Sequence, residues 1–474
     1  NIQKKQEMTS SPIVYSVFIG DEKPGETRIM RHPEIGDKPL RNTNSEGTKT
    51  IWQGLVHNIK DRNLGDKNFI GTRAKGKDGK LGDHYTWKTF RQMHDISLNF
   101  GKGAVLLNLC PEVNIDGEGK FKFLGIYSKN REEWMIADFG CHCNTVTVVP
   151  IYDTLGDLAM EHIFKLTQLS TILVEAKSLK KLLNLISKKM HSNVKNLIVL
   201  DPETEKETQA ALKDLGINIY TLEQVIEKGR GMDVALTPCT PEDIATICFT
   251  SGTTGLPKGV LVTQKNIMSE ISVISSHGFH FSTEDIYLSS LPLAHMMERL
   301  IFEVCVNFAI RVGFYSGDPR NLVDDCKILK PTCMCGVPRI FQRIYEKIND
   351  TIDKLPTLKK KITQQAIKSK LHELETRGIF THFFWDKVVF PTIRNLLGGR
   401  VRFILTGSAP MEPKVLSFLR ICLSAHIFEG YGGTENVAGM LITNATETRP
   451  GHIGGPGYAN EVKLLDHPEL KYTS

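Results

Sequence analysis

Short apolar runs alternate with amphipathic segments along most of this chain. Such runs are typical of strands buried in a parallel sheet, and segments whose apolar residues recur every three or four positions are typical of covering helices. Alternating strands and helices indicate an α/β fold. Between residues 104 and 200 this rhythm predicts strands at Ala104–Asn108, Phe123–Tyr127, Thr145–Ile151, Thr171–Val174 and Leu197–Leu200, and helices at Glu132–Cys143, Gly156–Leu166 and Leu179–Lys189.

A polar passage interrupts the rhythm between residues 201 and 243. It contains the polar run Asp201–Gln209 and two prolines, Pro238 and Pro241, so we expect a boundary between two subdomains there. A chain of 474 residues is long enough for a large core and for more than one domain. The rhythm then resumes, with strands predicted at Ile244–Phe249, Ile286–Ser290, Arg311–Tyr315, Cys333–Val337, Val401–Leu405 and Ala425–Phe428.

Residues 339–399 are predicted to form a helical insertion. Between Arg343 and Arg377, nine Lys or Arg residues stand against five Asp or Glu residues. A solvated helical pair explains this composition, and a basic face that meets a membrane surface is the sharper alternative. An apolar complement for such a face is provided by Phe383, Phe384, Trp385 and Phe390.

The densest chemical signal is the segment Thr250–Gly259, which follows the apolar strand predicted at Ile244–Phe249. Glycine lets the backbone approach a ligand, hydroxyl and N–H groups donate to phosphate oxygens, and Lys258 adds a positive charge. Thr263 is a candidate N-cap for a helix that starts at Gln264. We predict that a polyphosphate is bound by Thr250, Ser251, Gly252, Thr253, Thr254, Gly255 and Lys258.

This loop does not match the common nucleotide-binding signatures. A Walker A loop has the spacing G-x-x-x-x-G-K-[ST], whereas Lys258 stands between Pro257 and Gly259. No G-x-G-x-x-G sequence opens a helix either. A P-loop kinase or ATPase is therefore disfavoured.

Two later segments add candidate ligand-binding positions. The turn Gly407–Pro410 follows the strand predicted at Val401–Leu405, and open α/β sheets bind ligands at the carboxyl ends of their parallel strands. The segment Glu429–Glu435 spaces two acids, a tyrosine and a threonine with glycines. The tyrosine can stack on a purine and the threonine can donate to a phosphate oxygen. The last glutamate can ligate Mg²⁺, which prefers carboxylate and phosphate oxygens.

Together, Thr250–Gly259 and Glu429–Glu435 resemble the core motifs of the AMP-forming adenylating superfamily, which includes acyl-CoA synthetases and luciferases. The resemblance implies that Lys258 and the hydroxyl loop hold the ATP phosphates and the leaving pyrophosphate. It implies that Glu435 holds Mg²⁺, with a weaker contribution from Thr254. It also implies catalytic roles for Lys258, His295, Thr434 and Glu435, and an adenosine site at Gly407, Ser408, Ala409, Glu429, Gly430, Tyr431 and Gly432.

Weaker segments resemble the long-chain fatty acyl-CoA synthetase family in particular. They are Leu291–Arg299, in which His295 opens a predicted helix and is expected to line the acyl site, and residues 22–27, 329–332, 337–339 with 343–345, and 451–456. The resemblance implies the superfamily's large N-terminal domain, which consists of two helix-covered, mostly parallel sheets and part of a small β-barrel. We expect an N-terminal extension at 1–103, subdomains at 104–240 and 241–445, with the ATP-binding loop in the second, and the start of the barrel at 446–474.

Members of this family continue beyond the point where the sequence stops. The family has a later ribose-binding aspartate, a hinge and a mobile C-terminal lid domain with a catalytic lysine. Nothing after residues 461–464 matches these parts. We therefore expect a C-terminally truncated chain, and we assign none of these roles to its residues.

The overall composition sets broad limits. A net charge of +6 over 474 residues, without a basic tract interleaved with aromatics, does not indicate a nucleic-acid partner. No apolar run approaches the ~18 residues typical of a transmembrane helix. Ten cysteines are scattered along the chain, which indicates a reducing compartment. Because the pairs Cys141/Cys143 and Cys333/Cys335 lack C-x-x-C spacing, we interpret them as buried thiols and not as a zinc site.

These observations predict a long-chain fatty acid–CoA ligase that uses ATP, Mg²⁺ and coenzyme A. The fatty acid carboxylate attacks MgATP to give acyl-AMP and pyrophosphate, and the CoA thiol then takes the acyl group. We expect an intracellular enzyme, either cytoplasmic or in peripheral contact with the cytosol-facing surface of the endoplasmic reticulum, peroxisome or lipid droplet. Two alternatives stay open: an adenylating ligase for another carboxylate, and a non-catalytic fragment that binds ATP or acyl-adenylate.

Overall fold

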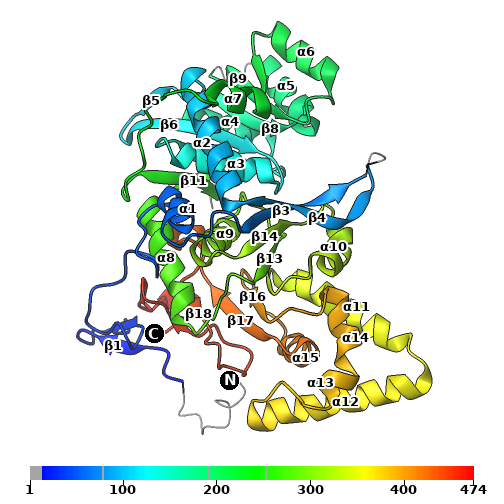
Figure 1. Cartoon of the computed structure of the whole chain (residues 1–474). Helices are drawn as coiled ribbons and strands as arrows, with labels where there is room; N and C mark the ends of the chain where they lie inside the picture. The colour runs from blue at the N-terminus through cyan, green and yellow to red at the C-terminus, as the bar shows by residue number, and fades with distance from the viewer. Residues whose placement is uncertain (1–12, 77–78, 189–192, 251–254, 474) are drawn as a thin grey trace.

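Two large β-sheets and a small one organise the chain in a computed structural model that describes residues 13–76, 79–188, 193–250 and 255–473. Figure 1 shows the eight-stranded sheet at the top, the nine-stranded sheet in the middle and a group of helices at the lower right. The α/β class with helix-covered, mostly parallel sheets is confirmed.

The eight-stranded sheet has the order β10-β9-β8-β6-β7-β11-β12, and β5 pairs with β6. The strands from β10 to β11 are parallel, whereas β5 and β12 are antiparallel to their neighbours. Its strands are β5 (Glu112–Ile115), β6 (Gly119–Tyr127), β7 (Thr147–Pro150), β8 (Thr171–Glu175), β9 (Asn196–Leu200), β10 (Asn218–Thr221), β11 (Ile244–Thr250) and β12 (Lys258–Thr263). The helices between them are α3 (Glu132–His142), α4 (Asp157–Thr167), α5 (Leu179–Ser187), α6 (Lys206–Asp214) and α7 (Leu222–Gly229).

The nine-stranded sheet has the order β19-β18-β17-β16-β15-β13-β14-β3-β4. Strands β17 to β3 of this order are parallel, and the outer pairings are antiparallel. Its strands are β3 (Asn68–Lys75), β4 (Leu81–Thr89), β13 (Ile286–Ser289), β14 (Arg311–Phe314), β15 (Cys333–Gly336), β16 (Phe403–Thr406), β17 (His426–Tyr431), β18 (Leu441–Ile442) and β19 (Gly455–Pro456). Helices α1 (Ile51–Lys60), α2 (Phe90–Leu106), α8 (Gln264–Ser276), α9 (Met296–Phe308), α10 (Leu322–Leu329) and α15 (Pro413–Leu423) accompany the two sheets.

The predicted insertion is helical. It consists of α11 (Pro338–Asp353), α12 (Thr357–Arg377), α13 (Trp385–Val388) and α14 (Phe390–Arg394), which join β15 to β16. Helices α11, α12 and α14 pack against α15 and thereby reach the nine-stranded sheet. Their buried side chains, such as Phe341, Ile348 and Phe390, form a second core with Leu416 and Leu419 of α15.

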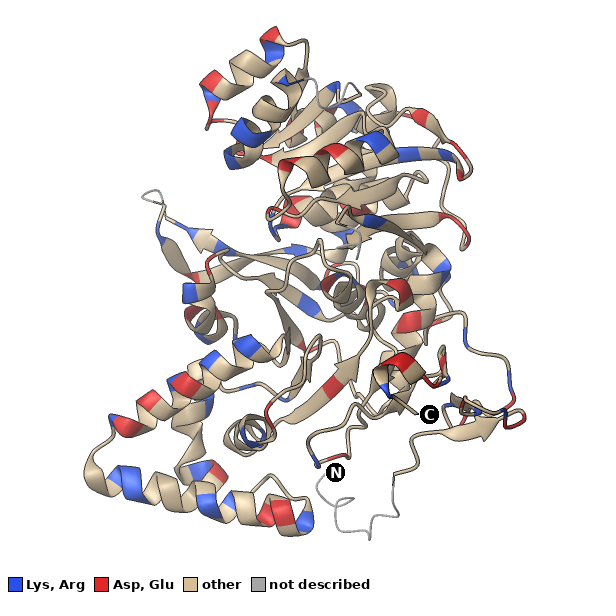
Figure 2. Cartoon of the chain, turned by 180° about the vertical axis from the view of Figure 1, so that it is seen from behind, with Lys and Arg blue, Asp and Glu red and all other residues tan. Residues whose placement is uncertain are grey.

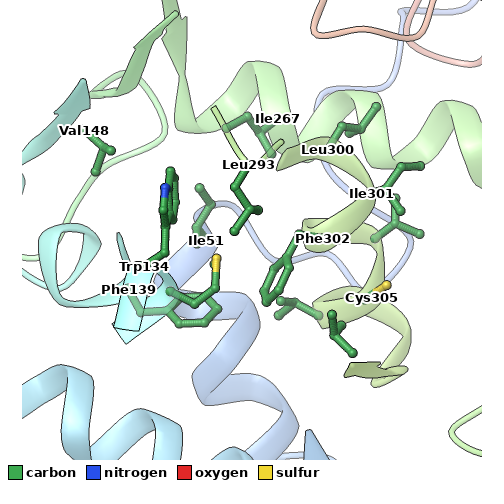
Figure 3. Packing of buried hydrophobic residues seen from close by; sticks show 14 of the residues in the cluster. Ile51, Trp134, Phe139, Val148, Ile267, Leu293, Leu300, Ile301, Phe302 and Cys305 are labelled. Atoms are coloured by element: carbon green, nitrogen blue, oxygen red, sulfur yellow. The ribbon is translucent and has the colours of Figure 1, made fainter. Parts of the chain in front are cut away.

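One continuous core joins the two large sheets. Helices α1, α3 and α9 meet between them, where the ring of Phe302 lies 6.2 Å from the ring of Phe139 (Figure 3). The Phe302 ring also lies 5.9 Å from that of Phe69. Val148 of β7 and Leu300 of α9 belong to the same buried cluster (Figure 3). The arrangement therefore fixes α9 relative to both sheets.

The strand predicted at Ala104–Asn108 is wrong, because this segment is the end of α2 and the turn after it. Thr89 and Gln92 form a capping box that starts the helix. Gly101 and Gly103 then allow α2 to pack closely, since a Cβ atom at these positions would lie 2.5 Å from Cys143 Sγ and 1.8 Å from the Val225 carbonyl oxygen. A short apolar run fits a buried helix end as well as a strand.

The chain passes from the eight-stranded sheet to the nine-stranded sheet later than the predicted subdomain boundary. The expected boundary at residue 240 would put Ile244–Thr250 in the second subdomain, but β11 and β12 extend the eight-stranded sheet. The expected N-terminal extension also takes part in the core, since β3 pairs with β14 and β4 pairs with β3. The division of the chain into domains stays a prediction, and sheet membership shows only where the strands lie.

A three-stranded sheet brings the two ends of the described chain together. It pairs β1 (Val17–Ile19), β2 (Ile29–Arg31) and β20 (Glu461–Val462) in antiparallel fashion. Arg31 Nε donates to Glu461 Oε2 over 2.8 Å across this sheet. Over the described residues these strands do not close into a barrel.

Candidate functional site

A cavity of about 290 Å³ lies where α9 faces the carboxyl ends of β16 and β17. It brings together several predicted site residues that are far apart in sequence, namely His295, Gly407, Ser408, Gly430, Gly432 and Thr434. Its other walls are mostly apolar and come from α8, α9, β18 and the turn before it, with side chains such as Val273, Ile274, Met297, Leu300, Ile301, Leu405 and Ile442.

Bare backbone forms one wall of this cavity. In the parallel pairing of β16 with β17, Thr406 is opposite Glu429, so Gly407 and Gly430 follow at adjacent strand ends. A Cβ atom at Gly407 would lie 3.0 Å from the carbonyl oxygen of Gly430. Two neighbouring strand ends without side chains leave room for a flat ring against the backbone.

The turn after Gly430 requires a residue without a side chain at position 432. A Cβ atom at this position would lie 2.2 Å from the carbonyl oxygen of Ala438, so only glycine fits there. The turn continues into the short helix η5 (Thr434–Asn436), where the Gly433 N–H donates to Asn436 Oδ1 over 2.7 Å. This turn presents Thr434 to the cavity and leaves the side chain of Glu435 exposed.

Three predicted adenosine-binding residues do not line the cavity. Ala409 and Tyr431 are exposed outside it. The carboxylate of Glu429 is buried and accepts a hydrogen bond of 3.2 Å from the Gly451 N–H, and burial raises its pKa. The geometry gives Glu429 a contact with the segment that follows β18, while the ring of Tyr431 has an open face for stacking.

His295 occupies the N-cap of α9 and lines the cavity. Its carbonyl oxygen accepts hydrogen bonds from the N–H groups of Glu298 and Arg299. The surrounding protein removes water from part of the ring and lowers the pKa of His295, so the imidazole is neutral at pH 7. No hydrogen bond joins this ring to any other residue that the structure describes.

Asn130 holds the turn that precedes His295, although the sequence analysis did not single it out. Its Nδ2 donates to Ser289 Oγ over 2.9 Å and to the Leu291 carbonyl over 2.6 Å, and its Oδ1 accepts from the Leu293 N–H over 2.7 Å. Asn130 follows β6 of the other sheet, so it ties the two sheets together at their carboxyl ends. An asparagine just after a buried strand was the available sequence signal.

A buried glutamate of α9 is hydrogen-bonded to strand β13. Glu298 accepts hydrogen bonds of 2.6 Å from both Tyr287 Oη and Ser289 Oγ. Burial raises the pKa of Glu298 to about 7. These contacts fasten the first turn of α9 to β13.

The predicted phosphate loop connects two paired strands. Thr250 ends β11 and is opposite Lys258, which begins β12, and the Thr250 hydroxyl donates to the Lys258 carbonyl over 3.5 Å. Gly255 has a φ of 95°, in the left-handed region that favours glycine. The predicted contacts of Ser251, Gly252, Thr253 and Thr254 lie outside the described residues.

The two core motifs are neighbours in space. Strand β12, which begins with Lys258, packs against η5, which contains Thr434 and Glu435. The predicted cap is confirmed as well, because Thr263 and Asn266 form a capping box at the start of α8. The two motifs thus meet through β12 and η5, while the exposed side chains of Lys258 and Glu435 do not line the cavity itself.

Glu435 suits an ion that is shared with phosphate oxygens. Within the described ranges, no group of three or more His, Cys, Asp or Glu residues could hold a metal ion. Mg²⁺ commonly takes one or two carboxylates and completes its shell with substrate phosphates and water.

The Cys-x-Cys pairs are four buried free thiols, and burial raises the pKa of Cys143 and Cys333 to about 12.

A second, apolar cavity adjoins the first. The two share Ile274, Ile301 and Leu405 as lining residues. The second cavity runs between α9 and the nine-stranded sheet, and its walls include Phe279, Phe281, Val304, Cys305, Ile310, Met334 and Phe403. The aromatic wall is packed tightly, since the rings of Phe279 and Phe428 lie 3.8 Å apart. This second space has a volume of only about 30 Å³, so an apolar chain enters it only if the packed side chains move apart.

Known proteins match this chain along most of its length. The AMP-binding enzyme family matches residues 71–474. The peroxisomal long chain acyl-CoA synthetase 7 of Arabidopsis thaliana is 34% identical over 94% of this chain and 60% of its own length. The fatty acyl-CoA synthetase A of Dictyostelium discoideum is 34% identical over 95% of this chain and 64% of its own length. The chain thus spans about three fifths of the length of these relatives.

Solved structures share the fold at low sequence identity. The adenylation domain of a carboxylate reductase from Mycobacterium chelonae has a TM-score of 0.65 and 19% identity over 83% of this chain and 59% of that chain. A long-chain-fatty-acid-CoA ligase from Archaeoglobus fulgidus has a TM-score of 0.59 and 15% identity over 86% of this chain and 69% of that chain. At this identity the likeness supports the fold alone.

Proposed function

The chain belongs to the AMP-binding enzyme family, and we propose that it binds and activates a long-chain fatty acid as part of a fatty acid–CoA ligase. One observation carries this proposal: the polar cavity that holds His295, Gly407 and Thr434 shares a wall with an apolar cavity. A carboxylate at the polar end of the first cavity, with a hydrocarbon chain that follows its apolar wall and opens the 30 Å³ second cavity further, accounts for the two parts of a fatty acid. The names of the Arabidopsis and Dictyostelium relatives agree with this substrate class.

The reaction that we propose has two steps. The fatty acid carboxylate attacks the α-phosphorus of ATP, the bond from that phosphorus to the bridging oxygen breaks, and pyrophosphate leaves. The thiol of CoA then attacks the acyl carbon and loses its proton to solvent, the acyl–phosphate bond breaks, and AMP leaves. Both steps build charge on phosphate oxygens, so positioned cations and donors provide most of the assistance.

In the proposed mechanism, residues of the two core motifs and of the cavity wall divide this work. Lys258, at the start of β12, neutralises the leaving pyrophosphate together with the hydroxyl loop. Thr434 donates to the α-phosphate from the cavity wall, and Gly407 and Gly430 give the adenine ring its flat surface. The neutral imidazole of His295 lies where the carboxylate meets the phosphate. Mg²⁺, when held by Glu435, supplies further neutralisation of the phosphate charge.

Calorimetry on the 474-residue chain tests the binding part of the proposal. We expect MgATP to bind, and an adenylate analogue that carries a palmitoyl chain to bind more tightly than its acetyl counterpart. Lys258→Ala should weaken MgATP binding by roughly tenfold, because it removes a charge-assisted hydrogen bond. Lys265→Ala is the matched control, since Lys265 is a neighbouring lysine whose side chain is 41% exposed and pairs with Glu242. Equal affinities for the palmitoyl and acetyl analogues would remove the long-chain assignment.

Product analysis separates the alternative reactions. Incubation with ATP, palmitate and CoA should release AMP and pyrophosphate, and ADP would indicate a phosphoryl-transfer enzyme instead. Binding of the palmitoyl analogue without any release of AMP would favour the non-catalytic alternative. Release of AMP with a short or aromatic acid, but not with palmitate, would favour an adenylating ligase for another carboxylate.

We also propose that the protein works at a cytosol-facing membrane surface. The relative from Arabidopsis is named as peroxisomal, and a fatty acid substrate partitions into bilayers. No helix among the described residues is both long enough and apolar enough to span a membrane. Cell fractionation with an organelle marker tests this location, and recovery in the soluble fraction alone would contradict it.

A further inference from the structure

The positive charge of this chain is concentrated in one helical arm, which we define as residues 338–400. The arm contains thirteen Lys or Arg residues and six Asp or Glu residues, whereas the rest of the chain contains 46 and 47. The arm therefore has a net charge of +7 and the rest of the chain −1, which together give the net charge of +6. Its helices α11 to α14 extend away from the two sheets, and Figure 2 shows Lys and Arg spread along them.

Most of the exposed cations of the arm are free. Among the residues that the structure describes, no ion pair is formed by Arg339, Arg343, Lys347, Lys354, Lys359, Lys361, Lys368 or Lys387, and all of these side chains are exposed. The inner cations are used to build the arm instead. Lys370 and Arg394 hold Asp386 at 2.6 and 2.9 Å, and Lys370 also lies 4.4 Å from the ring of Phe390. The free charges are therefore available to an anionic surface.

The arm also presents large apolar side chains to solvent. Phe383 is 82% exposed, Phe384 is 50% exposed and Val388 is 59% exposed. Lys387 lies 4.2 Å from the centre of the Phe383 ring, so a cation accompanies this apolar group. At the start of α12, Leu358 and Ile362 are also exposed and flank the run of Lys359, Lys360 and Lys361.

The outward position of these aromatics is fixed by hydrogen bonds beneath them. His382 Nδ1 accepts from the N–H groups of Phe384 and Trp385 over 3.2 and 3.3 Å. The carboxylate of Asp386 accepts from the His382 N–H over 2.9 Å and is itself held by Lys370. Burying the phenyl rings in a partner therefore requires little ordering of the backbone.

We infer that the helical arm docks on an anionic lipid bilayer, with Phe383, Phe384 and Val388 inserted at the headgroup boundary. Free lysines around an exposed aromatic group provide the two contributions that hold peripheral segments on membranes, namely apolar burial and attraction to lipid phosphates. An acidic protein would satisfy the charges but would need a matching apolar pocket. The inference rests on the arm alone and does not depend on the proposed ligase function.

Vesicle co-sedimentation of the 474-residue chain tests this inference. We expect binding to phosphatidylcholine vesicles that contain phosphatidylserine, and much weaker binding to phosphatidylcholine alone. Phe383→Ser with Phe384→Ser, and separately Lys359→Glu with Lys361→Glu, should each reduce binding roughly tenfold. Raised salt should weaken the binding of the wild-type chain, because it screens the charge attraction.

Matched controls keep the outcome interpretable. Leu158→Ser removes a residue of α4 that is 71% exposed, and Lys213→Glu with Lys228→Glu reverses two exposed lysines outside the arm. Both should bind vesicles like the wild type, and all variants should keep their unfolding temperature. Wild-type binding that ignores phosphatidylserine, or arm variants that bind like the controls, would overturn the inference. Capture of an acidic protein without vesicle binding would assign the arm to a protein partner and also overturn it.

Discussion

Arg299 and Asp138 form a buried salt bridge between the site helix and the eight-stranded half of the molecule, with 2.9 Å between Nη2 and Oδ1. Asp138 belongs to α3, and Arg299 lies one helical turn after His295 on α9. The guanidinium also lies 4.9 Å from the centre of the Trp134 ring, which belongs to α3 as well. The pair thus sets the position of His295 relative to the first sheet.

Replacing Asp138 by Ala should destabilise the fold strongly. The substitution leaves the Arg299 guanidinium buried without its counter-charge, and breaking one partner of a buried pair costs about 3–5 kcal/mol. Urea unfolding followed by circular dichroism measures the free energy of unfolding. Asp214→Ala, at an exposed position on α6, is the control and should stay within about 0.5 kcal/mol of the wild type. A loss below about 1 kcal/mol for Asp138→Ala would show that the pair adds little to stability.

His277 should make the protein less stable as the pH falls. Burial lowers the pKa of His277 from 6.5 to about 4, so between these values the unfolded chain takes up a proton that the folded chain refuses. The stability that depends on a neutral His277 is fully present above pH 6.5. It is lost as the pH falls toward 4, and the loss amounts to about 3 kcal/mol at most. The free energy of unfolding should therefore fall less steeply in His277→Gln than in the wild type. Parallel pH profiles for the two proteins would contradict this assignment.

The site turn should depend on the absence of a side chain at Gly432. A methyl group there would meet the carbonyl oxygen of Ala438 at 2.2 Å, so Gly432→Ala should shift η5 and with it Thr434. We expect MgATP binding to weaken by at least roughly tenfold, since a misplaced donor forfeits its hydrogen bond. Gly156→Ala is the control, because no atom lies within 4 Å of a Cβ built at Gly156. An unchanged dissociation constant in Gly432→Ala would separate this turn from ATP binding.

The sequence predicted best those elements whose whole environment is apolar. All five residues of Thr171–Glu175 are buried, and the run was recognised as a strand from its composition. Strands β3 and β4 were missed because polar and apolar residues are mixed along them without a regular period. The buried Arg73 of β3, for example, is neutralised by Asp324 and Asp325, about 250 positions away. Periodicity cannot reveal a partner at that distance in sequence.

The candidate site was predictable to the extent that its chemistry lies in local motifs. Lys258, Thr434 and Glu435 stand in Gly-rich segments whose composition marks them, and β12 and η5 bring these segments together. The cavity wall was not predictable, because Val273 and Met297 are ordinary apolar residues of amphipathic helices until α8 and α9 pack side by side. The position of a wall residue depends on helix packing, which the local pattern does not encode.

Ile301 should decide how long an acyl chain the site accepts, because it lines both the polar and the apolar cavity. Ile301→Trp places a larger ring between them, and overpacking at such a position also costs about 1–3 kcal/mol of stability. We expect the variant to bind a palmitoyl-adenylate analogue at least roughly tenfold more weakly, because the hydrocarbon loses its apolar contacts. Binding of the acetyl analogue, whose short chain stops before the apolar cavity, should change little and serves as the internal control. An equal loss for both analogues would show that the tryptophan disturbs the polar end of the site, and no loss for either would place the acyl chain elsewhere.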